Sequence, residues 1–349
     1  MNRKPPSNGS VTLEDVARVA GVSRATVSRV INGSTTVDPA MRRLVEDAVA
    51  ATDYVPNRAA RSLVTRRTDS IALVVSEAEQ RTVADPFLGR MFTDPFFGRM
   101  VTGVMEVIRP RGVQLVLMLV DDADSRTHLV SYLRQGHVDG VVLISGHAAD
   151  PLPGLLAEAA VPAVLSGRPG QPTPISFVEA DQRAGTVLGV EHLVATGRRR
   201  IATLTGPLDM PSAQERLAGF RQAMAAHGLE EAGVVEGDFT QAGGAAAMRL
   251  LLEQAPDLDA VFIASDLMAL GAVPVLNRAG RRIPEDVALV GFDDSSAALA
   301  CDPQLTTVRQ PLEEMSARMA QLLLQQIAEP EESLQSVVFQ PTLVVRGSA

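Results

Sequence analysis

Two kinds of hydrophobic pattern divide the chain. In the first 50 or so residues, apolar positions recur three and four residues apart, which predicts short amphipathic helices. From Ser70 onward, short apolar runs bounded by turn residues alternate with helical stretches. These runs are SIALVV, QLVLML, DGVVLI, PAVLS, RIATLTG, AVFIAS and VALVGF. Because such runs between helices are typical of buried parallel strands, we expect an all-helical head followed by an α/β body.

Turn and cap signals divide the head into helices. Thr12 is a good N-cap for the first helix, with Asp15 in place for a capping box, and Gly21 ends that helix. Ser23 caps a second helix and Asp38 a third. A helix, a short glycine turn and a second helix form the helix-turn-helix unit, whose second helix reads the DNA major groove.

The exposed face of the second helix carries side chains suited to reading bases. Arginine bonds the guanine edge twice, and small residues allow close approach to thymine methyl groups. The alternative is an ordinary three-helix unit with solvated arginines, but the coincidence of turn, caps and arginines favours DNA. The residues on this face are Arg24, Ala25, Thr26, Ser28 and Arg29.

The charge distribution agrees with a nucleic-acid partner for the head alone. Residues 1–67 carry 11 Arg and Lys against 6 Asp and Glu, whereas the remainder carries 21 against 35, within a net charge of −9. A basic head on an acidic body favours a polyanion at the head. With one cysteine, no long apolar run and no signal-peptide pattern at the start, we expect a cytoplasmic protein that does not bind membranes.

Composition argues against several enzyme classes. Lys4 is the single lysine, so neither a GK[ST] phosphate loop nor a Schiff-base lysine is available. No G-x-S-x-G elbow is present, and the five histidines lack metal-ligand spacing. We therefore predict no catalytic residue, no metal and no cofactor, although paired cleft carboxylates would leave an enzyme of sugar metabolism as a rival interpretation.

Seven or more strands exceed one comfortable sheet and suggest two βαβ lobes with a ligand in the cleft beyond the carboxyl ends of the strands. The side chains that follow those strands are carboxylates, hydroxyls, arginines and aromatic rings, which suit a polyhydroxylated ligand such as a sugar. The candidate effector-binding residues are Phe96, Phe97, Ser145, His147, Arg168, Asp209, Ser212, Arg216, Ser265 and Asp293.

Structural alternatives exist for some acidic and basic residues near these strand ends. Asp266 and Asp293 are placed to cap the helices after them, and for Asp266 the cap is the favoured interpretation. Arg216 has Glu215 or another acid as a possible ion-pair partner.

The stretch TLEDVARVAGVSRATVSRVING, followed by YVPNRAARSL, resembles the start of a lactose/galactose-repressor (LacI/GalR) family regulator, and the resemblance continues along nearly the whole chain. It implies a helix-turn-helix head and a two-lobed periplasmic-binding-protein-like (type I) body with parallel sheets. The implied domains are 1–56 for DNA binding, 57–67 for a hinge, and 68–349 for effector binding and dimerisation. Lobe 1 would hold about 68–180 and 311–338, and lobe 2 about 181–310 and 339–349.

The same resemblance assigns roles to individual residues. Arg24 and Ala25 would select the operator sequence and Arg29 would make a general base contact. About eight residues, 57–64, would form a hinge helix too short to be stable alone, which orders on DNA beside its dimer mate. Leu63 would be a wedge in the central base step, or alternatively a linker residue packed on the body. The full set for DNA is Thr12, Ser23, Arg24, Ala25, Thr26, Ser28, Arg29, Asn57, Arg58, Ala60 and Leu63.

In the body, SAQERLAGF resembles the start of the family's effector-binding helix, which implies a ligand contact for Arg216, and VGFDD implies one for Asp293. The chain contains the segment DPFLGRM followed closely by DPFFGRM, and the second copy matches the family motif beside the ligand. Residues 77–93 therefore resemble an insertion. It would form a lid over a larger ligand, such as a disaccharide or β-glucoside, or a surface loop.

Taken with these patterns, the resemblance implies a homodimeric repressor of carbohydrate-utilisation genes that a mono- or disaccharide releases from a double-stranded palindromic operator. Without C-terminal leucine heptads, nothing predicts an assembly beyond the dimer. Two alternatives stay open: a corepressor-dependent regulator that senses a nucleoside or purine, and a sugar-binding receptor without a DNA role.

Overall fold

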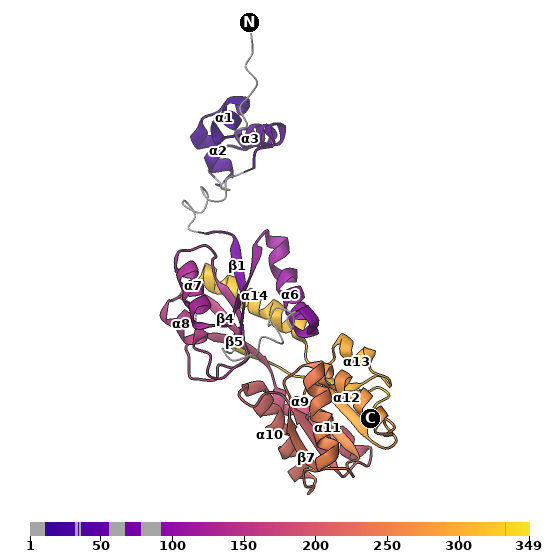
Figure 1. The fold of residues 1–349 in the computed structure, drawn as a ribbon. Helices are drawn as coiled ribbons and strands as arrows, with labels where there is room; N and C mark the ends of the chain where they lie inside the picture. The colour runs from indigo at the N-terminus through magenta and orange to yellow at the C-terminus, as the bar shows by residue number, and fades with distance from the viewer. Residues whose placement is uncertain (1–10, 32–33, 35, 56–66, 78–91, 332) are drawn as a thin grey trace. The chain divides into compact units, whose positions relative to one another are not determined.

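The computed structural model describes residues 11–31, 34, 36–55, 67–77, 92–331 and 333–349. The chain divides into two compact units, Met1–Thr68 and Asp69–Ala349, each described here by itself (Figure 1). The predicted hinge residues Asn57, Arg58, Ala60 and Leu63, and most of the predicted insertion, lie outside the described residues.

The first unit contains the three predicted helices. They are α1 (Leu13–Ala20), α2 (Arg24–Ile31) and α3 (Pro39–Thr52). Thr12 and Asp15 form a complete capping box at the start of α1, and Gly21 ends that helix with a left-handed φ of 65°. Val27 and Val45 are fully buried in the shared core, together with Val16. Local cap signals and a small apolar core therefore specify this unit.

Lobe 1 of the second unit is built on a six-stranded parallel sheet of order β11-β5-β4-β3-β1-β2. Its elements are β1 (Ser70–Ser76), α6 (Pro95–Ile108), η1 (Arg109–Arg111), β2 (Gln114–Val120), α7 (Ala123–Arg134), β3 (Val141–Ser145), α8 (Leu152–Glu158), β4 (Ala163–Ser166), β5 (Ser176–Ala180), α14 (Leu312–Ala328) and β11 (Ser336–Phe339).

Helices cover both faces of this sheet. Along β1, Ile71 and Leu73 pack in one core with α6 and α14, whereas Ala72 and Val74 pack in a second core with α7 and α8. In Figure 1, α6 and α14 lie side by side although more than 200 residues separate them in the sequence. Burial of both faces explains why the strand reads as a continuous apolar run.

Lobe 2 repeats this architecture with the order β12-β10-β9-β8-β6-β7, in which only β12 is antiparallel to its neighbour. Its elements are α9 (Gln182–Ala195), β6 (Ile201–Thr205), α10 (Pro211–Ala226), β7 (Gly233–Glu236), α11 (Gln241–Gln254), β8 (Ala260–Ile263), α12 (Asp266–Arg278), β9 (Ala288–Asp293), α13 (Ser296–Ala300), β10 (Thr306–Arg309) and β12 (Thr342–Val344).

The chain crosses between the lobes three times. The crossings follow β5, β10 and β11, and they are hydrogen-bonded to one another: Asp181 N donates to Phe339 O at 2.9 Å, and Gln182 Nε2 donates to Gln310 Oε1 at 2.9 Å. The third crossing comes after Phe339, because Phe339 still pairs with Ala180 in the lobe 1 sheet. The sequence boundary of about residue 339 for the return to lobe 2 was approximate, and in the structure Phe339 is the last residue of β11 in lobe 1.

All seven apolar runs form strands, which confirms the predicted α/β body with parallel sheets. The strands that the pattern missed, β5, β7, β10, β11 and β12, are three to five residues long. Several contain polar residues or alternate in burial, as in SFVEA of β5, so they offer no continuous apolar run. Within the described part of the chain, no helix is both long and apolar enough to cross a bilayer.

Candidate functional site

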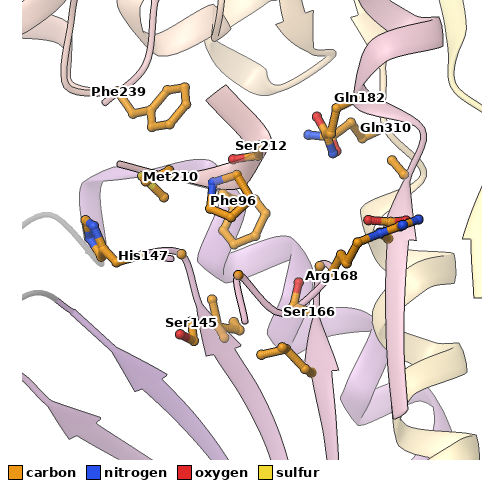
Figure 2. A pocket seen from close by; sticks show the side chains of 18 of the residues that line it. Phe96, Ser145, His147, Ser166, Arg168, Gln182, Met210, Ser212, Phe239 and Gln310 are labelled. Atoms are coloured by element: carbon orange, nitrogen blue, oxygen red, sulfur yellow. The ribbon is translucent and has the colours of Figure 1, made fainter. Parts of the chain in front are cut away.

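A cavity of about 410 Å³ lies in the second unit, at the carboxyl ends of strands from both lobes (Figure 2). All predicted effector residues except Asp209 line it. They reach it from the last residues of β3 and β9, from the loops after β3, β4 and β8, and from the first two turns of α6 and α10. The rule that ligands bind beyond the carboxyl ends of parallel strands therefore places the cavity correctly.

Arg216 is the centre of a buried polar network on the lobe 2 side. Its residue exposure is only 7%, its Nε donates to Gln182 Oε1 at 2.8 Å, and it donates to the carbonyl of Ala264. Its Nη2 lies 3.8 Å from Asp293 Oδ1. Burial lowers the pKa of Arg216. Glu215, the alternative partner, instead pairs with Arg183 at 2.9 Å.

Asp293 presents a largely buried carboxylate to the cavity. Its side chain is 18% exposed, and Gln310 Nε2 donates to its Oδ1 at 2.6 Å. Burial raises the pKa of Asp293 to about 6, Arg216 opposes that rise, and nearby Asp94 adds to it. Near neutral pH the carboxylate is an acceptor with few protein donors, so it can accept a ligand hydroxyl.

The backbone of Asp293 is strained and is held from the other lobe. Its φ is 108°, a region that residues with a side chain rarely adopt. Arg99 on α6 donates through Nη1 to Asp293 O at 2.8 Å and through Nη2 to Gln310 O at 3.1 Å. The same guanidinium forms a two-point pair with Glu313 at 2.7 and 2.8 Å. Arg99 thus joins lobe 1 to the loop that orients Asp293.

Aromatic rings approach the cavity from both lobes. Phe96 and Phe97 begin α6, whose cap is Asp94, and their rings meet edge-on with centroids 5.3 Å apart. Phe239 follows β7 in lobe 2, and Figure 2 shows Phe96 and Phe239 facing the same space. The Arg216 guanidinium lies over the ring of Phe292 at 3.9 Å and 5.6 Å from that of Phe239.

The structure overturns the favoured interpretation of Asp266. Ser265, with extended φ and ψ of −153° and 153°, is the N-cap of α12 and accepts from Met268 N. Asp266 is fully buried and instead accepts from Ser295 N at 2.7 Å and Thr307 Oγ1 at 2.6 Å. The cap belongs to the residue with extended backbone, one position earlier. Asp293 caps no helix either, because Ser295 caps α13.

Other predicted residues already have protein partners. Arg168 pairs with Glu179 at 2.8 Å and keeps a side chain that is 66% exposed. Ser145 donates to Asp150 at 2.6 Å. Ser212 lies in the first turn of α10 on the cavity wall. The structure thus places these polar groups at the rim and wall of the cavity.

Sequence reasoning missed several cavity residues. Gln182 begins α9 directly after one interlobe crossing, and Gln310 lies in another. Asp94 was treated only as part of a repeat. Phe239 follows β7, whose sequence GVVE holds only two strongly apolar residues. The signal available for Phe239 was its position in GDF, directly after β7. Among the described residues, no group of three or more His, Cys, Asp or Glu side chains is arranged to hold a metal ion.

In the head, α2 presents Arg24, Ala25 and Arg29 to solvent, while Val27 and Val30 face the core. Arg24 lies 3.0 Å from Glu14 of α1, an exposed pair that DNA would have to separate. Ser23 accepts from Thr26 N at 3.1 Å, so both are partly engaged in the start of the helix. Of the predicted base-reading residues, Arg24, Ala25 and Arg29 are therefore exposed, whereas Thr26 and Ser28 are half-buried.

Comparison with known proteins gives two family matches. Residues 12–57 match the bacterial regulatory proteins of the lacI family, and residues 190–349 match a periplasmic binding protein-like domain. The chain is 49% identical to the HTH-type transcriptional regulator CelR of Thermobifida fusca, over 97% of this chain and 98% of that protein. It is 34% identical to the ribose operon repressor of Escherichia coli K12, over 97% and 99%.

Solved structures agree with this assignment. A transcriptional regulator CelR–cellobiose complex is 46% identical with a TM-score of 0.75, over 97% of this chain and all of that chain. A lac repressor dimer bound to operator and the anti-inducer ONPF is 29% identical with a TM-score of 0.82, over 97% and 99%. The head motif, the two-lobed body and these full-length relatives together show that the chain is a DNA-binding transcriptional regulator of the lacI family.

Proposed function

We propose that this regulator is a cytoplasmic homodimeric repressor of carbohydrate-utilisation genes, and that a β-linked disaccharide of the cellobiose type releases it from a palindromic operator. The observation that carries the proposal is the cavity, which combines aromatic rings from both lobes with the carboxyl group of Asp293 and the guanidinium of Arg216. A cavity of about 410 Å³ is within the usual ~300–1,000 Å³ range of ligand sites.

The chemistry of this cavity suits a sugar. The apolar faces of pyranose rings pack on Phe96 and Phe239, while ring hydroxyls donate to Asp293 and accept from Arg216 and Gln310. A CelR structure similar to this chain holds cellobiose, which supports a β-linked disaccharide over a single ring. The relatives are regulators rather than enzymes, so binding rather than turnover is the proposed role of these carboxylates.

At the head, we assign base reading to Arg24, Ala25 and Arg29 on the exposed face of α2. Thr12, Ser23, Thr26 and Ser28 would bond phosphates or the edges of bases. The hinge residues Asn57, Arg58, Ala60 and Leu63 would contact the minor groove. A symmetric dimer presents two such heads to the two halves of a palindrome.

The proposed mechanism couples the cavity to the heads through the arrangement of the two lobes. An effector that binds one arrangement better shifts the population toward it. If that arrangement separates the two hinges, operator affinity falls by a coupling free energy of typically ~1–3 kcal/mol.

The test is fluorescence anisotropy with a palindromic DNA centred on a CG step, at fixed salt and pH 7.5, with cellobiose, glucose, ribose or hypoxanthine added. We expect specific binding that cellobiose weakens. Asp293→Asn should keep its affinity for the operator. Its release should require about tenfold more cellobiose, because a hydrogen bond from the sugar to a buried charge is lost.

Asp257→Asn is the matched control, because Asp257 is 61% exposed and lies outside the cavity lining. It should release like the unchanged protein. If no sugar released the protein from the operator and hypoxanthine strengthened operator binding, the effector would be a corepressor rather than an inducer.

A further inference from the structure

His147 holds a contact between the lobes at the edge of the cavity. Its Nδ1 lies 2.6 Å from Asp209 Oδ2 of lobe 2, and its Nε2 bonds the carboxylate of Glu77 in lobe 1. The imidazole is only 9% exposed. Figure 2 shows this ring at the opposite side of the cavity from Gln182 and Gln310. Both ring nitrogens are thus engaged by protein carboxylates rather than left for a sugar.

The fold brings the three groups together from distant parts of the sequence. Glu77 and His147 follow β1 and β3, which are neighbours paired with Ser76 opposite Ser145. Asp209 follows β6 of the other sheet. The backbones also meet, because Ala148 N donates to Asp209 O at 3.0 Å, and a Cβ on Gly146 would collide with the methyl group of Met210. The loops after β3 and β6 are therefore in direct contact.

Counting protons fixes the state of this histidine. A neutral imidazole has one N–H and one lone pair, so it can donate to only one of two ionised carboxylates. The second nitrogen would then direct a lone pair at a carboxylate oxygen. An imidazolium has two N–H groups and satisfies both carboxylates with charge-assisted hydrogen bonds. With both carboxylates ionised, the geometry is satisfied by the protonated ring.

We propose that His147 is a proton-dependent clasp that positions the two lobes around the effector, tying Glu77 of lobe 1 to Asp209 of lobe 2 when the ring is charged and releasing one of them when it is neutral. His147 is a positioning residue that acts through Asp209. The clasp itself needs no effector, whereas its effect on binding rests on the proposed function.

The surrounding charges favour the protonated ring. The hydrogen bond to Glu77 is the main cause that raises the pKa of His147, burial opposes it, and Asp209 adds to the rise. Arg126 Nη2 donates to the backbone carbonyl of Glu77 at 2.9 Å, and Arg126 Nε lies 3.5 Å from Asp150 Oδ1. Glu236 accepts from Leu208 N beside Asp209.

The direction of the pH effect follows. The raised pKa means that the clasp is complete below the ordinary histidine pKa of about 6.5 and is lost as the pH rises through the raised value. Mildly acid conditions hold the lobes together at this edge, and alkaline conditions free them.

The first test uses the full chain without effector or DNA. We would follow histidine ring resonances by NMR from pH 5 to 9, and assign the His147 signal with His147→Gln. We expect the pKa of His147 to lie above the ordinary histidine value of about 6.5. Asp209→Asn should lower the pKa of His147, and Asp209→Glu should restore it. A His147 whose pKa is not raised above the ordinary histidine value and does not respond to Asp209→Asn would overturn the clasp, whatever ligand the protein binds.

The second test measures cellobiose affinity by calorimetry over the same pH range. We expect the Kd for cellobiose to rise toward alkaline pH, and the rise to be about tenfold larger in the unchanged protein than in His147→Gln. A factor of about ten corresponds to the loss of one charge-assisted hydrogen bond. His227→Gln is the control and should keep the full dependence. Identical pH profiles in all three proteins would refute a role of the clasp in binding, while absence of cellobiose binding in all three would instead refute the proposed effector.

Discussion

At the scale of single residues, the fold buries ionisable groups in or beside the cavity that water would solvate in an unfolded chain. Asp266 is fully buried beside Thr307 and Ser295, and burial raises its pKa to about 8, with Asp293 adding to the rise. Asp293 ends β9, whereas Asp266 begins α12 shortly after the neighbouring strand β8, and Arg216 lies near Asp293. Asp266 therefore links α12 to β10 and α13 at a cost in desolvation, while Asp293 stays available to a ligand.

The raised pKa of Asp266 predicts how stability depends on pH. Between about pH 4 and pH 8 the folded state holds this proton and the unfolded state does not, so stability falls as the pH rises through that window. Asp266→Asn mimics the neutral acid and removes the dependence. We expect the melting temperature of Asp266→Asn to rise relative to that of the unchanged protein between pH 5 and pH 9.

Asp286→Asn is the control for this measurement. The hydrogen bond from Arg282 lowers the pKa of Asp286 on the surface, so Asp286 stays ionised from pH 5 to pH 9. The charge difference between Asp286→Asn and the unchanged protein is therefore constant over this range. Melting curves of Asp266→Asn that run parallel to those of the unchanged protein would contradict the burial argument.

At the scale of elements, α6 carries the first aromatic residues into the cavity and packs against α14. Gly103 permits that approach, because a Cβ there would overlap the Glu313 carbonyl and the Ser316 hydroxyl. Glu313 is also the carboxylate that pairs with Arg99. The close contact of the two helices and the orientation of the cavity loop therefore depend on the same short segment.

Two glycines of α6 allow a matched comparison. Gly103→Ala should destabilise the protein by about 1–3 kcal/mol, because the methyl group meets backbone that cannot move cheaply. Gly98→Ala faces open space and should be neutral or stabilise by up to about 1 kcal/mol through helix propensity. Urea unfolding monitored by circular dichroism measures both. Equal effects at the two positions would show that α6 and α14 do not need this close approach.

At the scale of the whole molecule, function requires the body to control a head that folds as a separate unit. Family membership supplies the reason to connect them, and the proposed hinge carries that connection. Leu63 lies outside the described residues, so its proposed role as a minor-groove wedge rests on the sequence.

Leu63→Ala tests that role. We expect specific operator affinity to fall by more than tenfold at fixed salt, because the wedge that stabilises the bent duplex is removed, while cellobiose affinity stays unchanged. Anisotropy with operator DNA and calorimetry with cellobiose measure the two quantities separately. Operator affinity equal to that of the unchanged protein would make Leu63 a simple linker residue.

The sequence by itself determined the elements whose signals are local. Continuous apolar runs identified the central strands, because strands buried on both faces must be apolar throughout. Caps and a glycine turn identified the helices of the head, as at Thr12 and Gly21. The position of residues after strands also led to most of the cavity, because parallel strands end at one edge of a sheet.

Only the tertiary structure decided which side chains meet. Arg99 bonds Asp293, a residue 194 positions away, and His147 meets Asp209 across the two lobes. Arg216 turns to Asp293 and Gln182 rather than to its sequence neighbour Glu215. Local patterns report how a segment buries its own surface. The partner of a buried charge depends instead on how two separately formed sheets come together around three crossings of the chain.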